Sequence, residues 1–307
     1  MVWTLSDGVA LVAALIASGA AYAFVAPRAI RRPRGGRAAG TVCDAAAGRV
    51  GALWRYPIKG FPAEPLERVA LEVGGSFPGD RAWAALVVDD AGDWDAAAPA
   101  WVHKRHFFGA FRSRPALFDV DVTSASAKLG SAAGRAVVEN DVRRRTGERC
   151  ALVYGGEAHQ FGNTRSGVRF CGDVRTIHVV NSASVAAVAA ATGLDVTAAV
   201  FRPNVALAGL APWAEEAWAP GTTLRLGGAV LEVIGRTVRC DAINTRPTTG
   251  ERWPGNRDLV SEIAARFPEV GPYLGFYARV LKGGAVAAGD AAAPIAVAPP
   301  PQLPPSR

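Results

Sequence analysis

One cysteine of this chain lies in a segment whose residue types could carry chemistry. The run "IGRTVRCDAINTRPTTGER", residues 234–252, places Cys240 directly after Arg239 and close in the chain to Arg236 and Arg246. Cations near a thiol stabilise the thiolate, which is the form that attacks electrophiles and binds metals. A lone cysteine is more often a small buried hydrophobic residue. The local sequence therefore leaves a metal ligand, a nucleophile and a core position open for Cys240.

The elements around Cys240 are expected to hold it just beyond a strand. The preceding run "GAVLEVIG", residues 228–235, is rich in Val, Leu and Ile, which favours a strand. Pro247 and Gly250 then predict a turn. Turns that follow strands are where a rigid framework presents functional groups, so this position suits a reactive or ligating side chain.

Further basic or polar residues lie at the ends of expected strands: Lys59 after "YPI", Arg81 after "GD", and Arg202 and Asn204 in "FRPN". Each alone is a weak signal, because a lone arginine is usually a solvated surface residue. If they meet Arg239 and Cys240 in space, the set suits an anionic ligand that carries phosphate. Arginine offers a rigid donor fork for such a ligand, and lysine offers a point charge.

The cysteine pattern excludes several classes of site. The four cysteines, Cys43, Cys150, Cys171 and Cys240, are scattered and form no C-x-x-C pair. Neither a zinc site nor a disulfide framework is indicated, and a reducing compartment fits best. The clustered spacing of a plant-type iron–sulfur module is also missing from the sequence.

Length and charge narrow the class of protein. A chain of 307 residues with 50% hydrophobic residues can bury a sizeable core and fits one large or two ordinary domains. The net charge of +7 comes largely from five arginines between residues 28 and 37. The rest is only mildly basic, which gives no general case for nucleic acid and leaves an anionic small molecule open.

The N-terminal segment predicts a membrane anchor at residues 1–27. From Gly8 to Pro27 no charge occurs for about twenty residues, the length of a helix that crosses a bilayer. Asp7 precedes this run and the arginines follow it, unlike a cleaved signal peptide. The positive-inside rule then directs the folded body to the cytosol. Because the run is rich in alanine, an interfacial or targeting helix stays open.

The remaining termini are expected to lack regular structure, and the body between them is expected to be β-rich. Residues 28–45 read as a basic linker, and the Pro-rich residues 291–307 read as a disordered tail. Short β-rich runs separated by Gly, Pro and Asp predict strands within 49–61, 67–75, 80–90, 116–122, 229–235 and 275–286. Helical spacing and end signals predict helices at 182–193 and 258–270.

Four of these motifs together resemble a known family. The runs "LWRYPIKGF", "GDRAW", "FRPNVAL" and "RCDAINTRPTTGER" follow the order found in proteins that pair an N-terminal β-barrel domain with a MOSC domain. The chain is most similar to the mitochondrial amidoxime-reducing component and its bacterial relatives, from Val50 to Asp290. The resemblance implies a β-rich α+β fold with a few helices. It comprises an N-terminal MOSC β-barrel domain at 46–150 and a MOSC β-barrel domain at 151–290, preceded by one transmembrane helix.

The resemblance also implies a molybdenum–pyranopterin cofactor, held in a cleft between the two domains. In the family the cysteine of the "RC" motif is a metal ligand, which gives Cys240 that role here. Arg239 adjoins this ligand as a cofactor contact, although a structural role is an alternative. The matches that imply contacts to the pterin and its phosphate are Lys59, Arg81, Arg202 and Asn204.

Two positions depart from the family pattern. Gly60 stands where the family often has a serine, which removes a hydroxyl donor, and Arg246 replaces an acidic residue with a cation. Cofactor geometry or substrate preference is therefore expected to differ from that of the best-known members. His103 and His106 lie in "HKRHFFG", which matches poorly. A place at the substrate entrance competes for them with a surface or packing role.

The function implied is a molybdenum reductase that removes oxygen from N-hydroxylated substrates such as amidoximes and hydroxylamines. Because no haem, flavin or iron–sulfur motif is visible, electrons are expected from a separate carrier that is cytochrome b5-like or ferredoxin-like. The body would face the cytosol from its membrane, which in a eukaryote is the mitochondrial outer membrane. The alternatives are sulfur transfer through a Cys240 persulfide and a non-enzymatic cofactor carrier. The pyridoxal-phosphate domain with which sulfurases generate the sulfur has no room in this chain.

Overall fold

The computed structural model describes residues 48–87, 106–109, 117, 119–123, 128–155, 170–171 and 174–296. All of them belong to one compact unit, which spans Cys43–Arg307. The predicted membrane anchor, the basic linker and His103 lie outside the described residues. Within the described ranges, no helix is both long enough and apolar enough to cross a membrane.

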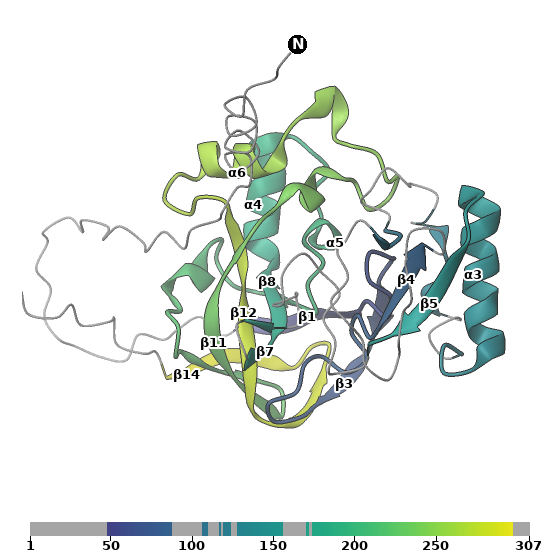
Figure 1. The fold of residues 1–307 in the computed structure, drawn as a ribbon. Helices are drawn as coiled ribbons and strands as arrows, with labels where there is room; N and C mark the ends of the chain where they lie inside the picture. Colours follow the sequence, from purple (N-terminus) through teal and green to yellow (C-terminus); the bar gives the residue numbers. More distant parts are fainter. Residues whose placement is uncertain are drawn as a thin grey trace, which may run out of the picture. The chain divides into compact units, whose positions relative to one another are not determined.

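A closed β-barrel forms the centre of the molecule (Figure 1). Its strands follow one another around the barrel in the order β14, β10, β11, β12, β8, β9 and β1, and β1 pairs with β14 to close it. Neighbouring strands are antiparallel except β8 and β9, which are parallel. The bounds are β1 Gly48–Arg55, β8 Ile177–Asn181, β9 Val205–Ala208, β10 Thr223–Leu226, β11 Ala229–Val238, β12 Tyr273–Lys282 and β14 Ala291–Ala296.

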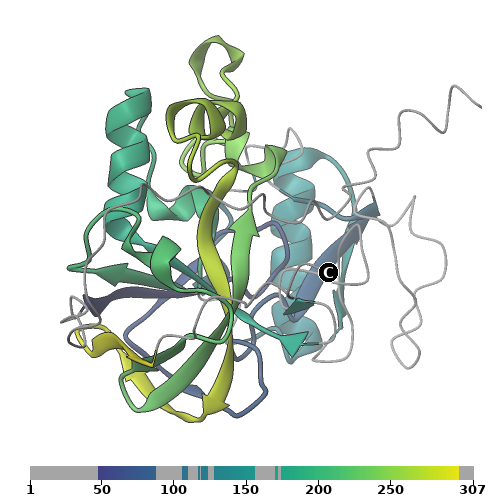
Figure 2. The ribbon, with the colours of Figure 1, turned by 90° about the vertical axis from the view of Figure 1, so that its left-hand side faces the viewer.

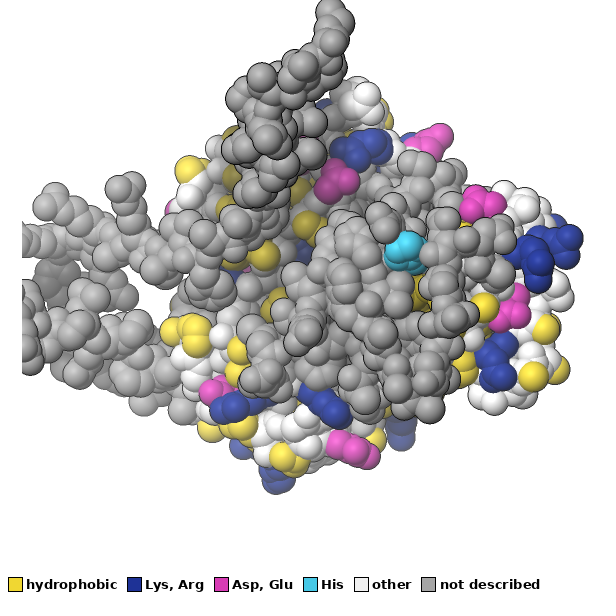
Figure 3. Space-filling view, viewed as in Figure 1, with side chains coloured by type: hydrophobic (Ala, Val, Ile, Leu, Met, Phe, Trp, Pro, Cys, Tyr) yellow, Lys and Arg dark blue, Asp and Glu magenta, His cyan; other side chains and the backbone are white. Residues whose placement is uncertain are grey.

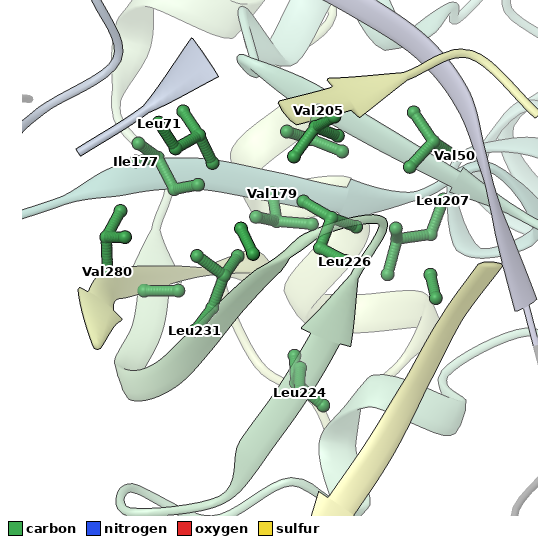
Figure 4. Packing of buried hydrophobic residues seen from close by; sticks show 14 of the residues in the cluster. Val50, Leu71, Ile177, Val179, Val205, Leu207, Leu224, Leu226, Leu231 and Val280 are labelled. Atoms are coloured by element: carbon green, nitrogen blue, oxygen red, sulfur yellow. The ribbon is translucent and has the colours of Figure 1, made fainter. Parts of the chain in front are cut away.

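Alternating side chains of these strands fill the barrel. Ile177 and Val179 of β8 point inward with Val205 and Leu207 of β9, and all four are at most 2% exposed. Figure 4 shows these residues meeting side chains from the facing strands, including Leu231 of β11. A period of two residues is what a strand with one face on a core requires.

Helices cover the outer face of β8 and β9. They are α4 Ser182–Thr192, α5 Ala198–Phe201 and α6 Leu259–Arg266, and both ribbon views place α4 and α6 on the same side of the barrel (Figure 2). Val180 and Ala206 pack beneath them. The predicted helices at 182–193 and 258–270 are confirmed in kind. Asn181, rather than a serine, caps α4, and Gly193 ends it with a φ of 66°.

Between β1 and β8 the chain forms several smaller elements. Strand β2, Glu64–Leu66, extends the sheet from β1, and β3, Arg68–Leu71, pairs with β13, Gly284–Ala287. Strand β4, Trp83–Val87, pairs with β5, Cys150–Tyr154, against which the helix α3, Ala132–Thr146, packs. A further short pair is formed by β6 Phe170–Cys171 and β7 Val174–Arg175.

The predicted N-terminal barrel domain at 46–150 is described only in part. The described residues of 46–150 do not close a barrel of their own, because β1 is instead a strand of the central barrel. Strand β4 forms its ladder with β5 and is joined to Ile58 and Phe107 by isolated bridges. The helix α3 was not expected either. Its apolar positions are sparse, with Val138 and Val142 buried but Val137 62% exposed. Its caps, Ser131 and Gly147, were the usable signal.

Two boundaries also need correction. The predicted strand at 116–122 is wrong, since the residues described there that have regular structure lie in helical turns. The folded part extends beyond Asp290, because β14 occupies Ala291–Ala296 of the predicted disordered tail. Pro294 lies beside a register irregularity of the β10–β14 pair, where a strand tolerates the missing N–H.

Candidate functional site

Three arginines from distant segments meet around Tyr56. Arg81 lies in the loop after β3, Arg202 in the turn between α5 and β9, and Arg239 just after β11. The donor Nη2 of Arg81 binds the backbone carbonyl of Arg202 at 3.2 Å, across 121 positions of the chain. Arg81, Arg202 and Arg239 all act electrostatically on Tyr56, which directly follows β1. The structure thus brings together three of the predicted cofactor-binding residues.

Arg81 is held by the short motif "GDR". Gly79 turns the chain with a φ of 70°, and the Asp80 carboxylate then accepts the backbone N–H of Tyr56 at 2.8 Å. The other oxygen of Asp80 pairs with the Arg81 guanidinium. The backbone N–H of Arg81 donates to the Tyr56 carbonyl at 2.6 Å. Asp80 therefore serves the loop and one arginine at once.

Arg202 ends the short helix α5 in a left-handed conformation, with φ 53° and ψ 52°. Arg81 is also left-handed, with a φ of 51°. Such backbone conformations cost about 1 kcal/mol or more for residues other than glycine. Strain of this kind gathers at functional sites, where the surroundings enforce it. Both guanidiniums lie against the Tyr56 ring, at 4.6 Å for Arg81 and 4.1 Å for Arg202.

Arg239 follows β11 and is half-buried between the exposed residues Val238 and Cys240. Its Nη2 donates to the carbonyl of Phe201 at 2.9 Å. Its Nη1 lies 3.3 Å from Nε2 of His178, a buried residue of β8. These contacts fix the guanidinium against the turn that carries Arg202.

His178 is neutral in this arrangement. Its Nδ1 lies 3.4 Å from the carbonyl of Arg202, which can only accept, so Nδ1 carries the proton and Nε2 accepts from Arg239. Burial, followed by the charge of Arg239, holds the pKa of His178 well below its ordinary value of 6.5. A second proton would place a further cation among the arginines.

The cluster contains more positive than negative charge. The carboxylate that acts on Tyr56 and Arg202 is that of Asp80, which already pairs with Arg81. Burial, together with the charge of Arg81, lowers the pKa of Arg202 to about 10. Burial is also the main reason that the pKa of Arg239 lies below its ordinary value. An anion bound here would relieve the repulsion and restore both pKa values.

The buried donors of the cluster without a hydrogen-bond partner within the described ranges include the phenol of Tyr56 and Nε of Arg239. A buried donor left unsatisfied costs about 1–3 kcal/mol, and native proteins avoid this unless a ligand or another group completes the site. The donor set therefore fits a ligand with several anionic oxygens, such as the phosphate of a pterin cofactor.

Asn204 and Lys59 occupy different positions from the arginines. Oδ1 of Asn204 accepts the N–H of His178 at 3.2 Å, and its Nδ2 donates to the carbonyl of Trp54 at 3.3 Å. This amide ties β8 to the end of β1 and is 2% exposed. The Lys59 ammonium lies 4.8 Å from the ring centre of Phe107. Cofactor contacts by these two residues remain predictions.

Cys240 is exposed at the start of a tightly held loop. The short 3-10 helix Asp241–Asn244 follows it. Asn244 donates to the carboxylates of Asp241 and Asp258, at 3.0 and 3.1 Å, and so links this loop to the start of α6. The indole of Trp253 donates to the carbonyl of Ile243 at 2.9 Å. The thiol is thus accessible to a ligand while its backbone is fixed.

No set of three or more His, Cys, Asp or Glu side chains in the described part of the chain could by itself hold a metal. Cys240 would therefore be a single protein ligand, which suits a metal whose other ligands belong to a cofactor. Of the other cysteines, Cys150 is buried in β5, and burial raises the pKa of its thiol to about 12. It is not suited to bind a metal as a thiolate.

The departures at Gly60 and Arg246 have structural explanations. Gly60 has a φ of 77°, and a Cβ there would lie 2.8 Å from Cα of Gly109, so a serine cannot enter without a shift of the backbone. Arg246 pairs with Glu251 across a loop closed by two backbone hydrogen bonds. Its positive charge is therefore balanced locally. His106 is half-buried.

Tyr56 and His178 were not predicted as site residues. Both lie in apolar runs, "RYPI" and "IHVVN", where an aromatic or a histidine reads as part of the core. Only the position of Tyr56 as the first residue of "YPIK" offered a signal. The charged side chains on the face drawn in Figure 3 do not point to a binding site, since Lys and Arg are interspersed with Asp and Glu there. The expected absence of nucleic-acid binding stays a prediction.

The chain matches the MOSC N-terminal beta barrel domain over residues 47–156 and the MOSC domain over residues 166–293. Together these matches cover most of the chain, which is therefore a MOSC domain protein with an N-terminal MOSC barrel domain. MOSC domains are associated with proteins that bind the molybdenum cofactor. No curated protein matches the chain at a significant level.

Three solved structures are similar at low identity. The YUAD protein from Bacillus subtilis is 15% identical, with 80% of this chain and 94% of that chain covered and a TM-score of 0.37. YiiM from Geobacillus stearothermophilus is 22% identical, with 39% and 54% covered and a TM-score of 0.30. YiiM from Escherichia coli is 17% identical, with 40% and 55% covered and a TM-score of 0.29. The chain spans little more than half of each YiiM protein, and these likenesses carry no argument about its function.

Proposed function

We propose that this MOSC protein binds a molybdenum–pyranopterin cofactor and reduces N-hydroxylated substrates such as amidoximes and hydroxylamines. The observation that carries the proposal is the excess of buried positive charge around Tyr56, where hydrogen-bond donors lack partners among the described residues. An exposed cysteine, Cys240, follows Arg239, one of the arginines of this cluster, in the chain. An anionic cofactor would neutralise the positive charge, and a metal bound to that cofactor would take the cysteine as a ligand.

Each residue has a separate task in this proposal. Arg81 and Arg202 bind the cofactor phosphate, because a guanidinium offers paired donors that match its oxygens. Arg239, held by Phe201 and His178, orients the cofactor beside the next residue, Cys240. The Cys240 thiolate ligates the metal. When bound, the cofactor supplies a molybdenum centre that removes the oxygen atom from the substrate with two electrons.

The remaining parts of the proposal concern partners. Electrons come from a separate carrier, cytochrome b5-like or ferredoxin-like, because the sequence shows no haem, flavin or iron–sulfur motif. The N-terminal segment anchors the protein to a membrane, with the folded body in the cytosol. These proposals rest on the sequence pattern and on the family resemblance.

Molybdenum and pterin content test the site directly. We expect the purified full-length protein to hold both near one per chain, and Cys240→Ala to lose most of the metal. The control is Cys150→Ala, which removes a buried thiol far along the chain and is expected to keep both. Unchanged metal in Cys240→Ala contradicts its role as ligand. Absence of both from the wild type, even after reconstitution with free cofactor, contradicts the proposed function.

Turnover then separates an enzyme from a carrier. With a chemical reductant and benzamidoxime, the loaded wild type is expected to release the amidine, whereas Cys240→Ala is not. A loaded protein without turnover on amidoximes and hydroxylamines supports the carrier. Sulfur released from Cys240 as persulfide, without bound metal, supports sulfur transfer.

A further inference from the structure

The phenol of Tyr56 is buried at the centre of the cationic cluster. Tyr56 is 2% exposed, and its ring lies against the guanidiniums of Arg81 and Arg202. Its backbone is held at both ends, with the N–H bound to Asp80 and the carbonyl bound to the N–H of Arg81. The side chain is therefore fixed in place before any ligand arrives.

The hydroxyl of Tyr56 makes no hydrogen bond to any described residue, either as donor or as acceptor. Buried tyrosines usually satisfy the O–H group, as the buried indole of Trp253 satisfies its N–H on the carbonyl of Ile243. A phenylalanine would offer the same ring to the arginines without leaving a polar atom unsatisfied. A tyrosine at this position therefore indicates a hydrogen-bond partner beyond the described residues, such as a bound ligand.

Its surroundings define the chemistry of that partner. Burial raises the pKa of Tyr56 to about 12, against the opposing effect of Arg202 and Arg81, so the group is a neutral donor at physiological pH. Cations surround it, and they attract an anion to the same place. A phosphate monoester offers oxygens enough to meet two arginine forks and a phenol together.

We propose that the Tyr56 O–H donates a hydrogen bond to an oxygen of the anion that Arg81 and Arg202 hold, and that Tyr56 is thus a binding residue of this site. The identity of the anion as the phosphate of a molybdenum–pyranopterin cofactor rests on the proposed function. The donor role of Tyr56 requires only that an oxyanion binds.

Two substitutions separate the hydroxyl from the ring. Tyr56→Phe removes only the O–H, and Tyr56→Leu also removes the surface on which both guanidiniums lie. The matched control is Tyr273→Phe, because the Tyr273 ring also lies under an arginine, Arg236, at 4.3 Å, but outside the cluster. The probe is inorganic phosphate, measured by calorimetry and by thermal shift on ligand-free full-length protein.

Tyr56→Phe is expected to weaken phosphate binding about tenfold, the loss that follows removal of a hydrogen bond to a charged group. Without phosphate, the same variant is expected to melt at the wild-type temperature or about 2 °C above it, because an unsatisfied polar atom is gone. Tyr56→Leu is expected to lower both the melting temperature and the affinity. Tyr273→Phe is expected to leave phosphate affinity unchanged.

The opposite signs of the two effects make the proposal testable. A Tyr56→Phe protein that melts lower than the wild type and binds phosphate equally well overturns it, since the hydroxyl would then be structural. Molybdenum cofactor content, measured on the same variants, keeps the two proposals apart. If phosphate binding depends on the hydroxyl but the wild type takes up no cofactor, the proposed function fails and the donor role stands. If the wild type and Tyr56→Phe take up cofactor and bind phosphate equally, the donor role fails and the proposed function stands.

Discussion

Two buried polar clusters of this protein differ in how completely their hydrogen bonds are made. One surrounds Glu215, which lies in the 3-10 helix Ala214–Ala217 and is 4% exposed. Its carboxylate accepts from Nδ2 of Asn181 at 2.8 Å and from the hydroxyl of Ser184 at 2.6 Å. That hydroxyl in turn accepts the N–H of Trp213 at 2.8 Å. Each of these groups has a partner inside the protein.

The other cluster surrounds Tyr56, and in it some donors have no partner and the positive charges outnumber the negative ones. Its phenol and Nε of Arg239 lack partners among the described residues, and Asp80 is the carboxylate set against three arginines. The difference teaches how to separate structure from binding when both are buried and polar. A satisfied cluster stabilises the fold, whereas an unsatisfied one lowers stability until a ligand completes it.

The largest expected effect falls on the satisfied cluster. Glu215→Leu leaves Asn181 and Ser184 as buried donors without their acceptor, which is expected to lower the free energy of unfolding by about 3 kcal/mol. Phosphate affinity should not change. Urea unfolding measures the loss, and the adjacent Glu216→Gln is the control, because Glu216 pairs with a partly exposed Arg236 and should cost less than about 1 kcal/mol. Equal losses in the two variants contradict the structural role of Glu215.

The second effect is a pH dependence that His178 gives to the edge of the unsatisfied cluster. Its folded pKa lies well below the ordinary value of 6.5, so below pH 6.5 the unfolded chain takes up a proton that the folded protein refuses. Stability should therefore fall with pH in this range, by up to about 1.4 kcal/mol per pH unit for this group.

Unfolding curves between pH 7 and pH 5 measure this slope, above the range in which Asp141, Asp241 and Glu262, whose pKa values are lowered, take up protons. We expect His178→Gln, which can still accept from Arg239, to show a shallower slope. Identical slopes in the wild type and the variant mean that His178 is not a buried neutral group.

The smallest expected effect on stability has the opposite sign. Arg202→Met removes a half-buried cation whose pKa is lowered to about 10, while the backbone carbonyl that binds Arg81 and His178 remains. The gain from removing the charge exceeds the lost contact with Tyr56 by an amount on the order of 1 kcal/mol. Phosphate binding should fall at least about a hundredfold, since the lost donor fork is charged. If Arg202→Met is less stable than the wild type, or binds phosphate equally well, the cluster around Tyr56 is structural like the one around Glu215.

Local patterns of the sequence predicted much of the secondary structure. The runs at 229–235 and 275–286 form parts of β11, β12 and β13, and the helices at 182–193 and 258–270 contain α4 and α6. These elements are marked by caps, by turn residues and by the periods 2 and 3.6, all of which act within a few residues. The helix α3 carried only its caps as a signal, because its apolar pattern is weak, and the short proline-containing β14 offered none of these signals.

The site was predictable in its residue types and not in its geometry. Arg81, Arg202, Arg239 and Cys240 were marked by their chemistry and by the family motifs, and the structure brings the arginines together. The role of Asn204 as a tie between β8 and β1 was not visible, because its partner Trp54 is 150 positions away. The same holds for Tyr56, which reads as a core residue until the arginines are placed around it.

By itself the sequence determined which residues could bind an anion or a metal, and where those strands and helices lie that carry clear turn, cap or periodicity signals. Those properties depend on side-chain chemistry and on neighbours along the chain. Only the tertiary structure decided that β1 belongs to the central barrel, that β14 closes it, and that donors of one cluster have no partner among the described residues. Strand pairing and the completion of buried hydrogen bonds depend on residues that are far apart in the chain. They are set by how the barrel closes and not by any single segment.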